Sequence, residues 1–293
     1  DGFTFDMGPS WYLMPDVFNT FFAEFNAKPE DYMDLVRLDP SYRVFFDEND
    51  YLDISKDLEK NLDLFEELEP GAKEKMKEYM KKSEYEYKIA MKDFIYKDYK
   101  HITDFFKPKL IVEGTKLHMF EKLDDYAQRF FKNKKIRQIL EYTIVFLGGS
   151  PYDSPALYSL MSHVDFNMGV WFPKGGMGKL SEAMQKLAMQ QGVKFVFDQP
   201  VEQILVEKGK ATAVKTKEKI FDADVVVVNA DYAWAETHLL DQKYQTYSEK
   251  YWDKKKIAPS AYLLFLGLDK QLTNFTHHNL YFHPEWVEHF DDI

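Results

Sequence analysis

The chain has 293 residues, enough for one large domain or two ordinary ones. Asp and Glu outnumber Lys and Arg by 49 to 38, and the resulting net charge of −11 argues against a nucleic-acid partner, because surfaces that bind nucleic acid are basic. Cysteine is absent, which excludes disulfides and thiolate metal sites, and the aromatic content of 17% calls for an extensive core or an apolar ligand.

The first part of the chain combines short strands with helices. Apolar residues alternate with polar ones over residues 3–7, which predicts a strand that stops at Gly8-Pro9. Ser10 and Asp16 are candidate caps of a helix whose apolar face runs over residues 17–25. Two further short strands are predicted at residues 42–46 and 51–54.

Amphipathic helices are predicted over the next hundred residues. From residue 56 to about residue 106 the sequence is highly charged, with apolar residues three and four apart. Pro70-Gly71 separates two of these helices and Pro108 ends the last. Further helices are predicted at residues 123–131, 135–146 and 156–164.

Residues 169–180 (Gly-Val-Trp-Phe-Pro-Lys-Gly-Gly-Met-Gly-Lys-Leu) are typical of a short strand, a glycine turn and the start of a helix. A Walker A loop is excluded because Pro173 and Leu180 stand where it needs Gly and a hydroxyl residue. The dinucleotide fingerprint G-x-G-x-x-G is also excluded, because Ser181 stands at its third glycine. The turn is therefore neither of these phosphate-binding loops.

A sheet is predicted after this turn. One helical stripe covers residues 180–188, and strands are predicted at residues 193–197, 201–206, 211–216, 225–228 and 262–268. The β-branched run at 225–228 is typical of a strand covered on both faces. We therefore expect an α+β fold in which a helical lobe is inserted into a sheet lobe, with a boundary near Met168.

Residues 1–10, 169–180 and 225–231, in that order, resemble the phytoene desaturase family of bacterial carotenoid dehydrogenases, within the flavin amine oxidase-like superfamily. Residues 137–138 with 146–151, and residues 277–282, also resemble that family. The resemblance implies an FAD-dependent oxidoreductase that introduces double bonds into a long apolar polyene at a membrane surface, with a cytoplasmic, peripherally membrane-associated location.

The resemblance also implies a division of the chain. Residues 1–10 and 169–233 would be parts of the flavin lobe, residues 11–168 a mainly helical substrate and membrane lobe, and residues 234–293 a return to that lobe. Members of the family begin with G-x-G-x-x-G and end with another glycine-rich flavin segment, and this sequence shows neither. We therefore expect a truncated, central fragment with an incomplete flavin lobe, inactive alone, whose full-length parent binds FAD.

The resemblance assigns cofactor contacts to three places: Gly8-Pro9-Ser10 close to the flavin ring, Asn229-Ala230-Asp231 near the FAD, and the backbone of Val201 at its adenosine part. The second of these follows the 225–228 strand, and open α/β sheets bind ligands beyond the carboxyl ends of their strands. Ordinary roles compete with these contacts. Gly8-Pro9 is also typical of a strand-ending turn, and Asp231 of a helix N-cap.

The resemblance further implies that Trp171, Phe172, Gly176 and Met177 line the passage of the apolar substrate, although plain core packing also explains the large ones. Arg137 matches an arginine near the reacting end and is the candidate catalytic residue. Asn133 stands where a carboxylate is expected one turn earlier, so a solvated or ion-paired surface arginine is the competing interpretation.

No metal site is predicted, because neighbours such as His277 and His278 face opposite ways on a strand and no fixed carboxylate completes a ligand set. Lysine clusters at residues 73–82 and 254–256 are solvated faces or contacts for lipid headgroups.

Two alternatives remain open: a related FAD oxidoreductase or isomerase acting on another polyene or a retinoid, and a lipid-binding module without catalysis. Oligomeric state is not predicted.

Overall fold

The computed structural model describes residues 2–98, 100–101, 117–255 and 260–291. The chain forms two compact units, one of residues 1–186 with 261–293 and the other of residues 187–260. Helices account for 43% of the chain and strands for 15%, which confirms the expected α+β class.

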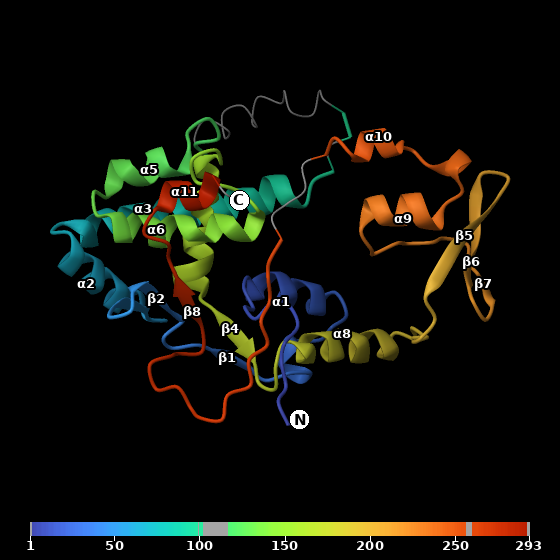
Figure 1. Ribbon diagram of the computed structural model, residues 1–293, viewed down its shortest axis with the longest axis horizontal. Helices are drawn as coiled ribbons and strands as arrows, with labels where there is room; N and C mark the ends of the chain where they lie inside the picture. The colour runs from blue at the N-terminus through green and yellow to red at the C-terminus, as the bar shows by residue number, and fades with distance from the viewer. Residues whose placement is uncertain (1, 99, 102–116, 256–259, 292–293) are drawn as a thin grey trace. The chain divides into compact units, whose positions relative to one another are not determined.

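The first unit contains most of the helices (Figure 1). Its elements in chain order are α1 (Pro15–Ala23), η1 (Pro29–Asp31), β1 (Leu35–Arg37), β2 (Tyr42–Asp47), β3 (Asp50–Ile54), α2 (Leu58–Leu68), α3 (Ala72–Ile89), η2 (Ala90–Ile95), α5 (Leu123–Phe130), α6 (Lys134–Glu141), η4 (Tyr142–Leu147), η5 (Ala156–Ser159), α7 (Leu160–Ser162), η6 (His163–Met168), β4 (Trp171–Pro173), β8 (Asn279–Tyr281) and α11 (Trp286–Asp291). Helix α8 (Gly178–Gln190) begins in this unit and ends in the other.

Two small sheets belong to the first unit. Strand β2 forms an antiparallel hairpin with β3 and pairs in parallel with β8, while β1 pairs antiparallel with β4. The strands predicted at residues 42–46 and 51–54 are therefore confirmed as β2 and β3. The hairpin is local in sequence, but β8 joins it from more than 230 residues away.

The core of the first unit lies between the helices and the β3-β2-β8 sheet. The apolar stripe of α2 buries Leu62 and Phe65, and α3 buries Met76 and Tyr79 on the face it presents to the same cluster. The helices predicted from period-3.6 patterns are confirmed at α2, α3 and α5. The predicted helix end at Pro108 lies outside the described residues.

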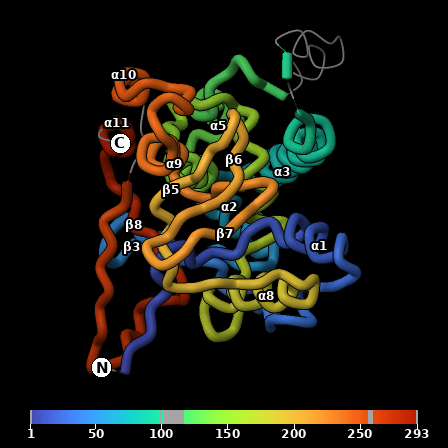
Figure 2. The backbone as a smooth tube through the Cα atoms, turned by 90° about the vertical axis from the view of Figure 1, so that its right-hand side faces the viewer, coloured from blue at the N-terminus to red at the C-terminus, as the bar shows by residue number. Residues whose placement is uncertain are grey.

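The second unit is an antiparallel meander with a helix against it (Figure 2). Its strands are β5 (Val201–Glu207), β6 (Lys210–Thr216) and β7 (Ile220–Asp222), and its helices are α9 (Tyr232–Leu239), η7 (Gln242–Tyr244) and α10 (Glu249–Trp252). Ala235 and Leu239 of α9 pack on Ile204 of β5 to form its small core.

Four predicted strands are wrong: residues 3–7, 193–197, 225–228 and 262–268 belong to no strand in the described part of the chain. Val225 is 76% and Val227 87% exposed, so this run is not covered on both faces, and only Val226 packs on the core of its unit. A strand needs a neighbour for its hydrogen bonds, and side-chain preference alone does not provide one.

Two of these segments nevertheless lie side by side. The N-terminal segment and the segment after residue 260 converge near the N-terminus in Figure 2. The rings of Phe5 and Phe265 have centroids 5.5 Å apart, and a Cβ on Gly267 would lie 2.7 Å from the ring of Phe3.

The start of α1 also differs from the prediction. Met14, in the left-handed region, is its N-cap and makes no side-chain cap, so Ser10 and Asp16 do not cap the helix. Asp16 instead accepts a hydrogen bond from the Tyr87 hydroxyl at 2.8 Å, which ties α1 to α3. The predicted division into flavin and substrate lobes stays a prediction, since the compact units divide the chain by contacts alone.

Gly169 joins the helical part of the first unit to β4, and its replacement by alanine is expected to destabilise the fold by about 3 kcal/mol. Its φ is +80°, and an added Cβ would lie 2.4 Å from Nε of Arg37, whose guanidinium donates to the carbonyls of Phe166 and Asn167. Urea unfolding measures the loss.

Gly71→Ala is the matched control, because Gly71 has φ +83° with open space around the Cβ position. It is expected to cost only about 1 kcal/mol, the contribution of backbone strain. Equal losses for the two variants would contradict the clash with Arg37.

Candidate active site

The segment before α1 runs beside β4 and the glycine turn that follows it. Tyr12 and Trp171 exchange two backbone hydrogen bonds of 3.0 Å. The Asp6 carboxylate accepts a hydrogen bond of 2.9 Å from the backbone N–H of Met177, and a Cβ on Gly176 would lie 2.9 Å from the same oxygen. The fold therefore brings the predicted flavin-proximal segment together with the predicted substrate-lining residues, some 160 positions apart.

The exposure of these residues differs. Gly8 and Pro9 are exposed, and no atom lies within 4 Å of the place where a Cβ on Gly8 would stand. Trp171, Phe172 and Met177 are half-buried, and Phe172 packs against the main core. Core packing and a lining role are thus compatible for Phe172, because one side of the ring contacts the core while part of it stays accessible.

His278 holds the predicted flavin-proximal segment in place. It is 7% exposed, its Nε2 lies 3.0 Å from the carbonyl oxygen of Ser10, and its ring centroid is 5.0 Å from that of Trp11. Burial, with a smaller contribution from His277, lowers the pKa of His278 to about 4. The ring is therefore neutral near pH 7, with its proton on Nε2 because a carbonyl can only accept.

The neighbouring His277 is exposed to solvent. Its ring centroid lies 4.4 Å from that of Phe172 and 4.6 Å from that of His278. Burial lowers the pKa of His277, and the Asp6 carboxylate opposes that shift. Sequence reasoning set these two histidines aside with the metal hypothesis, yet they face the predicted site.

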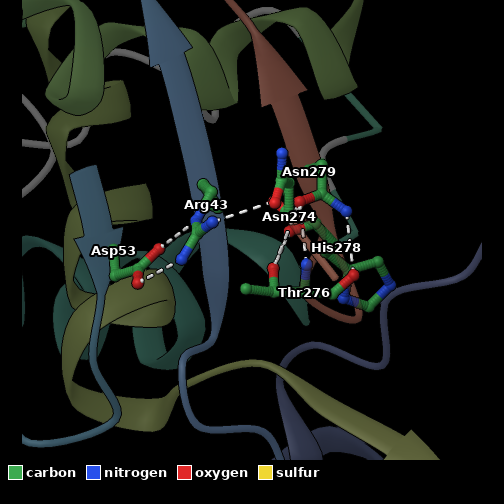
Figure 3. A network of polar contacts seen from close by, with 6 residues as sticks. All are labelled: Arg43, Asp53, Asn274, Thr276, His278 and Asn279. Carbon is green, nitrogen blue, oxygen red and sulfur yellow. Dashed lines mark hydrogen bonds and ion pairs between the residues drawn. The ribbon is translucent and has the colours of Figure 1, made fainter. Parts of the chain in front are cut away.

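Arg43 of β2 anchors the chain just before the two histidines (Figure 3). Its guanidinium forms a bidentate pair with Asp53 of β3 at 2.6 and 2.8 Å, and Nη1 donates to the carbonyl of Asn274 at 2.8 Å. Its backbone N–H donates to the carbonyl of His278 at 2.9 Å. The hairpin thus fixes both ends of the 274–278 segment.

A closed set of hydrogen bonds shapes the turn itself (Figure 3). The Asn279 side chain accepts from the backbone N–H of Thr276 at 3.0 Å and donates to its carbonyl at 2.8 Å. The Thr276 hydroxyl donates to the carbonyl of His278 at 2.7 Å. The position of the histidine pair is therefore set by side chains that belong to the turn.

Arg137 lies elsewhere in the first unit, in a cavity of about 300 Å³ between α5, α6 and α11. It is half-buried, and its buried Nε has no hydrogen-bond partner among the described residues. Asn133 caps α6 by accepting from the backbone N–H of Lys135. A carboxyl group does lie one turn from Arg137, but it is that of Glu141, which follows Arg137 in the sequence and lines the same cavity.

Three of the buried acidic side chains in the helical part of the first unit have raised pKa values. Burial raises the pKa of Glu141 to about 8, reinforced by the charge of Asp124, and Glu141 accepts a hydrogen bond of 3.0 Å from the Trp286 indole. Burial also raises the pKa of Glu86 to about 8, although the Ser159 hydroxyl donates to it.

The third buried acid, Asp165, accepts hydrogen bonds from two tyrosine hydroxyls. The distances to Tyr42 and Tyr142 are 2.6 and 3.1 Å, and complete burial raises the pKa of Asp165 to about 7. None of these three acids was singled out from the sequence. The spacing along α3 could have indicated the burial of Glu86, because Glu86 lies seven residues after Tyr79 and hence on the same, buried face of the helix.

The remaining predicted cofactor residues lie in the second unit. Val201 begins β5 and pairs with Thr216, and residues 229–231 form an exposed loop. The Asp231 carboxylate accepts from the backbone N–H of Trp234 at 2.7 Å, so its role as the N-cap of α9 is confirmed. Contact of these residues with FAD stays a prediction.

Residues 1–270 match the protein family described as "Flavin containing amine oxidoreductase". The chain belongs to this family. Curated relatives over the whole chain are a "Carotenoid 3,4-desaturase" of Haloarcula japonica (44% identical), a "zeta-carotene-forming phytoene desaturase" of Myxococcus xanthus (32%) and a "Phytoene desaturase" of Phycomyces blakesleeanus (30%). The resemblance to phytoene desaturases inferred from the motifs is thus confirmed.

This flavin amine oxidoreductase chain spans 59%, 56% and 51% of the length of these three relatives. Among solved structures, an oxidoreductase of Methanosarcina mazei has a TM-score of 0.47 and 17% identity, covering 79% of this chain and 47% of its own.

The family is flavin-containing, as the sequence motifs implied. The Gly8-Pro9-Ser10 segment has an exposed main chain with open space at Gly8, which is compatible with the close approach of a flat ring, and its contact with flavin stays a prediction. Within the described residues, no group of three His, Asp or Glu side chains is arranged to hold a metal.

Proposed function

We propose that this chain is part of an FAD-dependent carotenoid desaturase that introduces double bonds into a long apolar polyene. The observation that carries the proposal is the 44% identity to a carotenoid desaturase over the entire chain, including the segments that meet at Asp6, Gly176 and Met177. The proposal is also supported by the aromatic rings and the exposed glycine main chain that lie near this contact.

The flavin, when bound, supplies the oxidising power, since protein side chains cannot accept the electron pair of a C–H bond. Gly8-Pro9-Ser10 would hold the ring end of the cofactor, oriented by the His278 bond to Ser10. Trp171, Phe172, Gly176 and Met177 would line the path of the polyene and exclude water from it. Val201 and residues 229–231 would hold the rest of the FAD.

The proposed substrate is apolar, so we infer that the enzyme works at a membrane surface. Phe21 on α1 and Phe25 in the turn after it are each 39% exposed and offer apolar contacts. No helix within the described ranges has the length and apolarity required to cross a bilayer. The lysine cluster at residues 73–82 is weaker support for membrane contact than the exposed phenylalanines are. Four of its lysines already pair with a carboxylate: Lys73, Lys75, Lys77 and Lys82.

The test uses the full-length, flavin-loaded protein with a colourless polyene in liposomes. Anaerobic mixing is expected to bleach the oxidised-flavin absorbance and to produce a longer, coloured chromophore. Absence of any flavin-dependent absorbance change with every member of a polyene and retinoid panel would overturn the proposal. Turnover of only another polyene or a retinoid would favour a related FAD oxidoreductase or isomerase. Binding to vesicles without any turnover would favour a lipid-binding module without catalysis.

A further inference from the structure

The imidazole of His277 differs from the other side chains of the 274–279 turn in its hydrogen bonding. Within the part of the chain that the structure describes, neither of its ring nitrogens forms a hydrogen bond, whereas the adjacent His278 is bonded to Ser10. The ring of His277 lies in an edge-type contact with that of Phe172, one of the residues proposed to line the polyene path. A base with free nitrogens therefore lies beside an apolar surface.

Hydrogen bonds fix the chain both before and after His277. The Arg43 guanidinium fixes residue 274, and the Thr276 and Asn279 side chains close the turn around the histidine pair (Figure 3). These bonds fix the backbone on either side of His277 and so position the residue for a reaction that needs defined geometry.

We propose that His277 is the proton acceptor of the desaturation, a catalytic role that rests on the proposed function. Oxidation of a CH–CH unit removes one hydride and one proton. The hydride leaves one carbon for the flavin, which is reduced by two electrons as the substrate is oxidised by two. The C–H bond on the adjacent carbon then breaks, its electron pair becomes the second bond of the double bond, and the proton passes to a ring nitrogen of His277.

The electrostatic surroundings suit this role. Loss of a hydride leaves a carbocation whose neighbouring C–H bond is strongly acidic, so a weak base such as neutral imidazole suffices. The groups that act on His277 are the Asp6 carboxylate, which stabilises the imidazolium, and the neutral His278. Asp6 belongs to the same segment as Gly8-Pro9-Ser10, so the base and the proposed flavin-binding segment are positioned together.

The first experiment compares flavin reduction by polyene in the full-length, flavin-loaded wild type, His277→Gln and His283→Gln. His277→Gln is expected to react about 100-fold more slowly and to lose the acid limb of the pH–rate profile. His283 is exposed, hydrogen-bonds to the backbone of Glu285 and stacks on the ring of His289, so it serves as the matched control and its variant is expected to react as the wild type does. Equal rates and equal pH profiles for wild type and His277→Gln would overturn the proposal.

The second experiment needs no turnover. A histidine NMR titration of the same protein is expected to give His277 a pKa below 6.5 that falls further in Asp6→Asn. A pKa that Asp6→Asn leaves unchanged would overturn the pairing. The two proposals fail differently: a wild type that never reduces its flavin contradicts the proposed function, whereas a reactive wild type with an equally reactive His277→Gln contradicts only the role of His277.

Discussion

The free energy of unfolding is expected to fall as the pH rises from about 6.5 to about 8.5. Glu86 and Glu141 have their pKa values raised to about 8 in the fold, against 4.5 for an unperturbed glutamate. Over this interval the unfolded chain carries both carboxylates ionised, while the folded chain binds their protons until the pH passes about 8. Stability that is fully present below about pH 4.5 is therefore lost as the pH rises through about 8.

The size of the effect follows from linkage. Each pKa unit corresponds to about 1.4 kcal/mol, so each glutamate accounts for about 2 kcal/mol between pH 6.5 and 8 and the pair for about 4 kcal/mol. Asp165, with a pKa raised to about 7, adds to the lower part of this range. His163 and His278 have lowered pKa values and act in the opposite sense, but only below about pH 6.5.

Thermal unfolding at several pH values measures this slope, and the expected decrease in Tm is about 10 °C. The double variant Glu86→Gln, Glu141→Gln is expected to flatten the slope, because an amide does not titrate. Glu66→Gln serves as the control, since Glu66 is only half-buried and its pKa is lowered by bonds from the backbone N–H groups of Gly71 and Lys73. A Tm that stays level or rises over this interval would show that the buried carboxyls are ionised in the fold.

Trp286→Ala is expected to cost about 4 kcal/mol of folding free energy. Trp286 is 5% exposed, and its ring centroid lies 4.9 Å from that of Phe282 and 5.0 Å from that of Phe290. Its indole N–H also donates to buried Glu141 at 3.0 Å. Truncation removes the anchor of α11 on α6 and leaves a buried carboxyl without its donor.

Trp286→Phe separates the two contributions, because it keeps an aromatic ring and removes the N–H. We expect it to cost about 1–2 kcal/mol and to raise the pKa of Glu141 further, since the indole bond favours the ionised form. Urea unfolding gives both losses. If the alanine variant were no less stable than the phenylalanine variant, α11 would not be held by this side chain.

The sequence predicted the parts of the fold whose causes are local. The β2–β3 hairpin forms where alternating residues flank an acidic turn, and α2, α3 and α5 form where apolar residues recur at helical spacing. The predicted strands at residues 225–228 and 262–268 failed because a β-branched or apolar run specifies a preference and not a partner. No ladder reaches them among the described residues.

The candidate site was predicted in part for the same reason. The segments at residues 8–10 and 171–177 were recognisable as motifs, but their contact through Asp6 and the Tyr12–Trp171 bonds depends on chain positions far apart. The sequence also showed a His-His pair without indicating what it faces. Alternation along a strand was used to reject a metal site, and it said nothing of a contact with Phe172.

By itself, the sequence determined the class of the fold, the family and the local elements, because hydrophobic periodicity and short motifs act over a few residues. Only the tertiary structure decided which polar groups lose water: Glu86, Glu141 and Asp165 are ordinary acids in the sequence and buried groups with raised pKa values in the fold. Only the tertiary structure also brought His277 beside Asp6 and Phe172, since burial and long-range proximity arise when distant segments pack together.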